Sequence, residues 1–209
     1  MKPDQLPLKL PKKTPVIVVD PLNDFTHPKG VIARVYGAED TKPLRDLLPV
    51  LNTMALKWKL NAEIILCRSL YRDNQFNVPG LENLCTEDNC WGRDSPIDSR
   101  LFHNEFEKQD NSILVTDDGE IRGILESVRF AVLTGMTLTS CIAASKAQIC
   151  KEIPDITLVV PRDTTGVLAS RATDGEALFR EWEAAEETRV LVTPSWKDIK
   201  FSPKQASPR

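Results

Sequence analysis

Several features that mark common classes of protein are absent from this sequence. It has no uncharged apolar run of about 18 residues, which a membrane-spanning helix needs. Its first residues, MKPDQLPLKLPKK, lack the apolar segment of a secretory signal, so we expect a cytoplasmic protein. The net charge of -3 and the pI of about 5.5 provide no basic face, so we expect neither a nucleic-acid nor a membrane partner.

Histidines and phosphate-binding glycine patterns are also scarce. The two histidines, His27 and His103, lie far from each other and from the Cys85 and Cys90 pair. A zinc site at that pair would need further soft ligands, so a disulfide or plain loop thiols are the other interpretations. The loop PLNDFTHPKG lacks the glycines that cradle phosphates, which argues against a nucleotide-binding module. We expect no metal and no cofactor.

The composition that remains is that of an ordinary soluble globular protein. The 209 residues are 41% hydrophobic and 27% charged, which suits one domain with a sizeable core. We expect an extended arm over residues 1–14, one domain over 15–200 and a flexible tail over 201–209. Five cysteines without an export signal indicate free thiols, and Cys67 and Cys150 fit apolar patterns typical of small core residues.

Short apolar runs alternate with helical patterns along the body of the chain. The runs cover residues 15–20, 62–67, 129–134, 156–161 and 189–193, with a weaker one at 104–108. Runs that are apolar on both faces suit parallel strands covered by helices. The alternation predicts a doubly wound α/β fold with right-handed crossovers.

Two details of the helices can be predicted from their sequences. The apolar spacing over residues 44–58 predicts a helix that starts near Asp46, which would place Pro49 in its first turn. The segment from Thr173 to Glu176 has the pattern of a capping box that opens the last long helix.

In such sheets the reacting groups gather at the carboxyl ends of the strands. Asp20 ends the first apolar run, and Lys108 ends the weaker run. Cys141 follows the run that ends near Thr134. We therefore expect Asp20, Lys108 and Cys141 at the same edge of the sheet, although they are far apart in sequence.

The segment from Gly135 to Cys141 is the most informative in the chain. A glycine ends a strand, a short turn follows, and the cysteine opens a small-residue helix that Thr139 or Ser140 can cap. The helix dipole favours the thiolate and lowers the pKa of the thiol, and free N–H groups there can hold an oxyanion. This arrangement suits acyl transfer, and a buried structural cysteine is the alternative.

The two charged candidates each have a functional and a structural interpretation. A carboxylate directly after four apolar residues is costly to bury, so Asp20 is a candidate to take the thiol proton and return it to a leaving group. The alternative is that Asp20 caps the following turn, although Asp24 could be that cap instead. Lys108 could stabilise the thiolate and the carboxylate, or it could be an ordinary surface lysine.

Two segments resemble the isochorismatase-like cysteine hydrolases. VIVVDPLNDF is similar to the opening strand of that superfamily, which is usually followed by D-x-Q-N-D-F, and VLTGMTLTSCIAASKAQI is similar to its nucleophile segment. The order and spacing of Asp20, Lys108 and Cys141 match over residues 15–193. The resemblance implies a three-layer, Rossmann-like α/β fold with a mainly parallel six-stranded sheet, and it implies a homo-oligomer.

The resemblance also implies an activity and a site. Members hydrolyse small amides, ureido compounds or vinyl ethers, and the retained Cys141 favours amide or related C–N substrates with a thioester intermediate. The catalytic residues would be Asp20, Lys108 and Cys141. The resemblance further implies a cis peptide between Met136 and Thr137, with the N–H groups of Thr137 and Cys141 as oxyanion donors.

Departures from the family pattern leave other functions open. Leu22 replaces the usual Gln, and Leu138-Thr139 replaces the usual Thr-Asp, so a non-catalytic oligomeric scaffold or ligand-binding protein is one alternative. A vinyl-ether hydrolase is another. The family's nicotinamidases have a D-x-H metal motif after the second strand, whereas this region has no His and leaves Asp73 without obvious co-ligands. We therefore expect no metal.

The substrate-binding residues are the least determined part of the prediction. We expect the insertion at residues 80–98 to fold over the site. Candidate substrate-binding residues are Phe25, Tyr71, Arg68 and Trp91, with Arg93 as a further wall residue. The alternative is that Trp91 packs the loop down and that the arginines are solvated. The expected partner is a small-molecule substrate.

Overall fold

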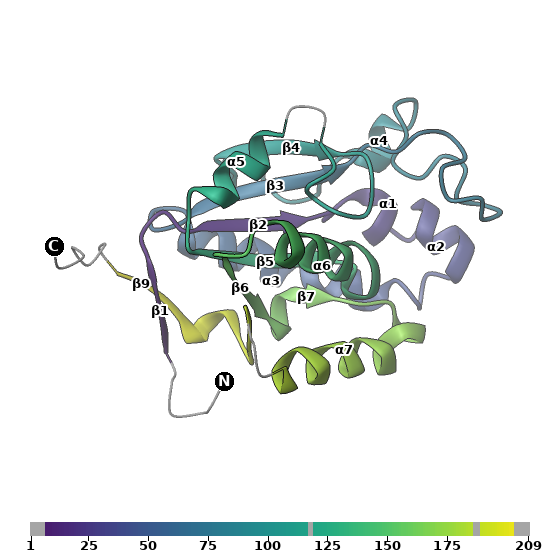
Figure 1. The fold of residues 1–209 in the computed structure, drawn as a ribbon. Helices are drawn as coiled ribbons and strands as arrows, with labels where there is room; N and C mark the ends of the chain where they lie inside the picture. The colour runs from purple at the N-terminus through teal and green to yellow at the C-terminus, as the bar shows by residue number, and fades with distance from the viewer. Residues whose placement is uncertain (1–6, 117–118, 186–188, 203–209) are drawn as a thin grey trace, which may run out of the picture.

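The computed structural model describes residues 7–116, 119–185 and 189–202. Its main sheet has the strand order β4-β3-β2-β5-β6-β8, with every neighbouring pair parallel and a short β7 paired to β5 (Figure 1). The strands are β2 (Pro15–Val19), β3 (Glu63–Ser69), β4 (Asn104–Lys108), β5 (Phe130–Met136), β6 (Thr157–Pro161), β7 (Thr165–Gly166) and β8 (Val190–Thr193).

Helices cover both faces of this sheet, as Figure 1 shows. They are α1 (Asn23–Thr26), α2 (Val31–Tyr36), α3 (Lys42–Trp58), α4 (Cys90–Arg93), α5 (Glu120–Glu126), α6 (Ala143–Glu152) and α7 (Ala172–Ala184). Successive side chains of a strand point to opposite faces. Val16 and Val18 of β2 therefore join the core under α3, while Ile17 and Val19 join the core under α5, α6 and α7. Because both faces are covered, β2 is buried along its whole length.

The predicted fold class is confirmed. Each apolar run forms a strand whose bounds lie close to the predicted ones, and the weaker run at 104–108 is the edge strand β4. The main path has the predicted six strands, and β7 is an addition of only a few residues. Among the described residues, no helix is long and apolar enough to cross a membrane.

Two predictions about helix starts are wrong. Helix α3 begins at Lys42, so Pro49 lies inside it and Pro43 occupies the first turn. The Thr53 hydroxyl donates a hydrogen bond to the carbonyl of Pro49 at 2.7 Å, which gives that carbonyl a partner within the helix. Helix α7 begins at Ala172, so Thr173 is already helical, and no side-chain cap hydrogen bond forms at this end.

The two ends of the described chain pair with each other. Strand β1 (Leu8–Pro11) runs parallel to β9 (Ile199–Ser202) in a separate two-stranded sheet. Part of the expected arm is therefore a strand, and Phe201 and Ser202, which were expected in the tail, belong to β9. The rest of the tail and residues 1–6 lie outside the described residues.

Candidate active site

Asp20 directly follows β2, and its carboxylate lies at the carboxyl end of the sheet. Its φ of 52° is left-handed, a conformation that Asp tolerates better than most residues. The backbone N–H of Asp20 donates to the carbonyl of Cys67 at 2.9 Å, which holds this turn against β3. Oδ1 accepts hydrogen bonds from the N–H and the hydroxyl of Ser69, both at 2.8 Å. Asp20 is therefore fully buried and oriented by the end of β3.

Lys108 ends the edge strand β4 and is also fully buried. Its Nζ lies 3.0 Å from Oδ2 of Asp20 in an ion pair with no solvent exposure on either side. Burial lowers the pKa of Lys108, but the nearby Asp20 and Cys141 raise it more, so the pKa lies well above its usual value and the ammonium stays charged. The ammonium donates to the Ser69 hydroxyl at 2.7 Å, the Tyr71 hydroxyl at 2.9 Å and the Asp110 carbonyl at 2.9 Å.

Cys141 lies just after β5, in a π-helical turn (Leu138–Ile142) that leads into α6. A cis peptide joins Met136 to Thr137, as the resemblance implied. The cap predicted at Thr139 or Ser140 does not form, because no side chain accepts a cap hydrogen bond there. The Ser140 hydroxyl instead bonds with the hydroxyl of Thr137.

The predicted lowering of the Cys141 pKa is wrong. Burial is the largest influence and raises the pKa of the thiol. Lys108, with its Nζ 3.6 Å from the sulfur, lowers that pKa, and Asp20 raises it again. The net direction is upward, so the resting sulfur at neutral pH is a thiol that needs a base to become a nucleophile.

The structure thus brings Asp20, Lys108 and Cys141 together at the carboxyl ends of the parallel strands. Oδ2 of Asp20 and Sγ of Cys141 both lie within 3.6 Å of the same ammonium. Oδ2 contacts the Lys108 ammonium, and a hydrogen bond with the Asp20 side chain is one of the influences that raise the pKa of the Cys141 thiol, so this carboxylate is within reach of the thiol proton. The arrangement combines a thiol, a proton acceptor and a fixed positive charge.

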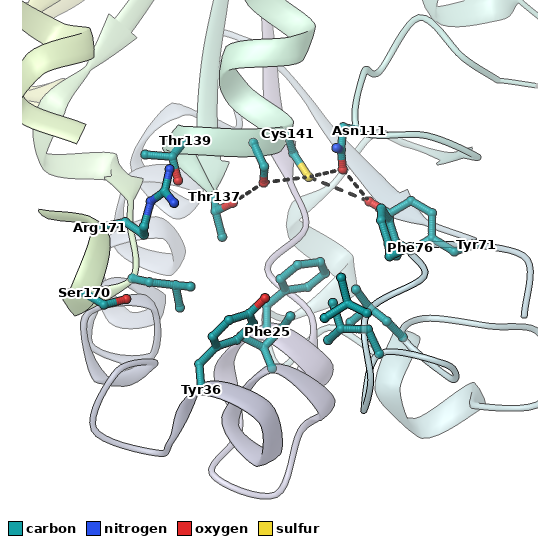
Figure 2. Close-up of a pocket in the computed structure, with 16 residues that line it drawn as sticks. Phe25, Tyr36, Tyr71, Phe76, Asn111, Thr137, Thr139, Cys141, Ser170 and Arg171 are labelled. Carbon is teal, nitrogen blue, oxygen red and sulfur yellow. Dashed lines mark hydrogen bonds between the residues drawn. The ribbon is translucent and has the colours of Figure 1, made fainter. Parts of the chain in front are cut away.

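A cavity of about 350 Å³ opens onto the sulfur. In Figure 2, Cys141, Asn111 and the Tyr71 hydroxyl meet on one side, with Tyr36 and Phe25 across from them. Arg171 lies near Thr139. Most of the wall is apolar or aromatic, and it comprises Phe25, Ile32, Tyr36, Tyr71, Phe76, Val78, Leu81, Leu84 and Leu168, with Asn111, Thr137, Thr139, Ser140, Ser170 and Arg171 as the polar residues beside Cys141.

Two of the four candidate substrate-binding residues line this cavity, namely Phe25 and Tyr71. Arg68 and Trp91 do not line it, and their role in substrate binding stays a prediction. Arg68 alternates away from the site on β3, where it pairs with Glu105 and Glu107 of the neighbouring strand at 3.5 and 3.4 Å.

Trp91 packs against His27 edge to face and keeps 45% of its surface exposed. Arg93 pairs with Glu107 at 3.3 Å and lines no part of this cavity. The insertion covers the site through Leu81 and Leu84 only.

Asp24 holds the insertion at residues 80–98 in place and takes no part in the Asp20–Lys108–Cys141 cluster. Its buried carboxylate accepts hydrogen bonds from Val31 N at 3.2 Å, Cys85 N at 2.8 Å and Asn89 Nδ2 at 2.7 Å. It therefore joins α1 to the start of α2 and to the loop that covers the cavity.

The two leucine departures have a structural explanation. Leu22 is fully buried in the core on the α3 side, and Leu138 lies in the opposite core, where it packs close to Gly175. Neither leucine lines the cavity, whereas Thr139, the second residue of the Leu138-Thr139 departure, does line it.

The sequence interpretation missed Ser69, Asp110 and Asn111. Ser69 could have been found, because it ends β3 at the same sheet edge as Asp20 and Lys108. Asp110 and Asn111 follow β4 in a run of Asp, Asn and Ser that indicates a turn but does not say which groups face the site. Of the remaining thiols, Cys85 is buried, Cys90 is exposed, and both are free rather than paired.

Comparisons with known proteins identify the fold. The structure superposes on an isochorismatase-like hydrolase from Alkaliphilus metalliredigens with a TM-score of 0.64 and 17% identity, covering 86% of this chain and 94% of the other. For the pyrazinamidase of Pyrococcus horikoshii the TM-score is 0.68, with 19% identity and coverage of 87% and 98%. For the N-carbamoylsarcosine amidase from Thermoplasma acidophilum the TM-score is 0.64, with 14% identity and coverage of 90% of this chain and 99% of the other. No family sequence model and no curated protein sequence matches the chain.

The donor set at this edge does not fit a metal ion. The Pyrococcus pyrazinamidase was solved in complex with zinc. Here no group of three or more His, Cys, Asp or Glu among the described residues could hold a metal. The hydroxyls of Ser69 and Tyr71 are instead bonded to the Lys108 ammonium, whose charge would repel a second cation. We therefore derive no step through a metal.

Proposed function

We propose that this chain is an isochorismatase-like hydrolase that cleaves a C–N bond of a small amide or ureido compound through a thioester on Cys141. One observation carries the proposal: the buried Asp20–Lys108–Cys141 cluster opens through its sulfur onto a cavity of about 350 Å³. A cavity of this size suits a small molecule. The shared fold with a pyrazinamidase and an N-carbamoylsarcosine amidase supports C–N rather than vinyl-ether chemistry.

In the first half of the reaction, Sγ of Cys141 attacks the substrate carbonyl while its proton moves to Oδ2 of Asp20. The backbone N–H groups of Thr137 and Cys141 stabilise the negative charge on the carbonyl oxygen. The C–N bond then breaks, the proton on Asp20 moves to the leaving nitrogen, and ammonia or an amine departs. The acyl group remains on the sulfur.

The second half restores the enzyme. Asp20 removes a proton from a water molecule that attacks the thioester carbonyl. The C–S bond breaks, the acid product leaves, and the thiolate takes back the proton from Asp20. Lys108 keeps its own proton throughout, because its charge stabilises the carboxylate and the thiolate in turn.

The test is ammonia or amine release from a panel of small amides and ureido acids. We expect Cys141→Ala to lower turnover at least about 1000-fold, because the covalent intermediate cannot form. The circular dichroism spectrum should be retained, since the change is small. In the wild type, rapid quenching followed by intact-mass measurement should detect the acyl group on the chain.

Cys90→Ala is the matched control, because Cys90 is an exposed thiol at the start of α4, outside the cluster. It should turn over the same substrates as the wild type. Full turnover by Cys141→Ala would contradict the thioester mechanism. The homo-oligomer and the small-molecule partner are part of the same proposal, and light scattering in solution measures the first.

A further inference from the structure

Tyr71 is the only cavity-wall residue with a hydroxyl on the Lys108 ammonium in the part of the chain that the structure describes. It follows β3, and its N–H donates to the carbonyl of Cys85 at 3.0 Å. Its ring packs edge to face on Phe76, with centroids 4.7 Å apart, and only 3% of its surface is exposed. Its hydroxyl lies 2.9 Å from Lys108 Nζ and 3.8 Å from Cys141 Sγ.

The Lys108 ammonium has few hydrogens left to donate to the sulfur of Cys141. An ammonium has three hydrogens. Four oxygens lie within 3.0 Å of Nζ, on Ser69, Tyr71 and Asp110 at 2.7–2.9 Å and on Asp20 at 3.0 Å. The sulfur of Cys141 at 3.6 Å is the most distant acceptor of the ammonium, so it receives at most a shared hydrogen.

The Tyr71 hydroxyl is in a position to supply the missing donor. Because its oxygen accepts from Lys108, its own hydrogen must point to another acceptor. The two within reach are Sγ of Cys141 at 3.8 Å and Oδ1 of Asn111 at 3.5 Å. A hydroxyl that accepts from a cation becomes a stronger donor, because chained hydrogen bonds polarise one another.

Tyr71 also stays protonated in this environment. Burial is the largest influence and raises the pKa of the phenol well above its usual value, and the negative charge of a Cys141 thiolate raises it further. The donor hydrogen is therefore present when the sulfur becomes negative.

We propose that Tyr71 is a catalytic residue whose hydroxyl donates a hydrogen bond to the Cys141 thiolate and so conveys the charge of Lys108 to the nucleophile. This role of Tyr71 depends on the proposed function in one respect, namely that the sulfur of Cys141 is the nucleophile. When Asp20 accepts the thiol proton, the hydrogen of Tyr71 turns from Asn111 to the sulfur. No covalent bond to Tyr71 forms or breaks.

The first test measures the thiol itself, without substrate, in the full-length chain. Tyr71→Phe keeps the ring on Phe76 and removes only the hydroxyl. Iodoacetamide alkylation is followed across pH by mass spectrometry of the peptide that contains Cys141. We expect the titration of Cys141 to move up by about one pH unit, which slows alkylation about tenfold at a given pH on the rising limb.

Tyr36→Phe is the matched control, since it removes the chain's other tyrosine hydroxyl from the same cavity wall. It should leave the titration of Cys141 in place. A Tyr71→Phe titration equal to the wild type, or shifted to lower pH, overturns the proposal. A uniform change of rate at every pH would indicate altered access to the sulfur and overturns it too.

The second test uses any substrate that the wild type turns over. Tyr71→Phe should lower kcat about 100-fold and change KM less than about threefold, because the bond strengthens only as charge develops on the sulfur. A rise in KM alone would assign Tyr71 to substrate binding and contradict the proposal. If the wild type turns over nothing, the proposed function fails, and the alkylation result still decides the role of Tyr71.

Discussion

Lys108 is a fully buried ammonium whose charge is balanced mainly by the Asp20 carboxylate. Removing one partner of such a pair leaves the other charge buried and uncompensated. The hydroxyls of Ser69 and Tyr71 solvate the ammonium but cannot neutralise it. The pair therefore contributes to stability as a unit, and a double-mutant cycle measures it.

We expect Lys108→Met to lower the free energy of unfolding by about 3–5 kcal/mol, because it leaves the buried Asp20 carboxyl without its partner. Asp20→Asn should be destabilising for the converse reason. The double variant should lose less than the sum of the two single losses, by about 1–3 kcal/mol. Urea unfolding followed by tryptophan fluorescence measures all three variants.

Lys42→Met provides the matched control, since Lys42 pairs with Asp46 on the surface of α3 with both side chains more than half exposed. It should change the free energy of unfolding by less than about 1 kcal/mol. Strictly additive losses in the buried cycle would show that the Asp20–Lys108 pair does not act as a unit.

At the scale of single residues, charge and polarity were harder to predict than position. Asp20 and Cys141 could be placed at the sheet edge because each follows a recognisable strand. The direction in which the Cys141 pKa shifts could not be predicted, because it depends on how deeply the sulfur is buried. The helix dipole is only one influence on that pKa. Arg68 does not line the cavity, because one residue along a strand reverses the face on which a side chain lies.

At the scale of elements, the site depends on how closely β5 approaches β2. Gly135 pairs with Val19, the residue before Asp20, and leads through Met136 to the turn that holds Cys141. Its φ is 107°, and a Cβ at this position would lie 2.2 Å from the carbonyl oxygen of Val19. Only glycine suits this close approach of β5 to β2, which brings Asp20 and Cys141 to the ends of two adjacent strands.

We expect Gly135→Ala to lower the free energy of unfolding by at least about 3 kcal/mol, because the obstructing atom belongs to the main chain of a central strand. Gly123→Ala in α5 is the control, since a Cβ there meets nothing within 4 Å. It should raise the free energy of unfolding by about 0.5–1 kcal/mol. Urea unfolding measures both, and equal stability of the two variants would contradict the argument.

The strands were predicted well because each carries its own signal, a β-branched run that is buried on both faces. The pairing of β1 with β9 could not be predicted, since it joins segments at opposite ends of the sequence, and each is only four residues long. The turn that places Asp110 and Asn111 was missed for a similar reason. Its Asp and Asn residues indicate a turn, but the contact of Asn111 with Cys141 forms only in the folded chain.

At the scale of the whole molecule, the β1–β9 sheet lies at the amino end of β2, opposite to the strand ends that carry the proposed site (Figure 1). Strand β1 leads into the amino end of β2, whereas Asp20 follows its carboxyl end, about 16 Å further along a strand of this length. Leu10 of β1 is fully buried in the core on the α3 side, together with Trp58 and Trp196. The pairing of the chain ends therefore contributes to stability without contacting the Asp20–Lys108–Cys141 cluster.

We expect Leu10→Ala to lower the free energy of unfolding by about 2–4 kcal/mol, because it leaves a cavity in a packed core. The pH dependence of Cys141 alkylation should stay as in the wild type, since no group of the charged cluster moves. Leu8→Ala, on the same strand but only partly buried, should cost less than about 1 kcal/mol. A shifted Cys141 titration in Leu10→Ala would show that the pairing of the chain ends helps to position Cys141, and the independence of this pairing from the cluster would then be wrong.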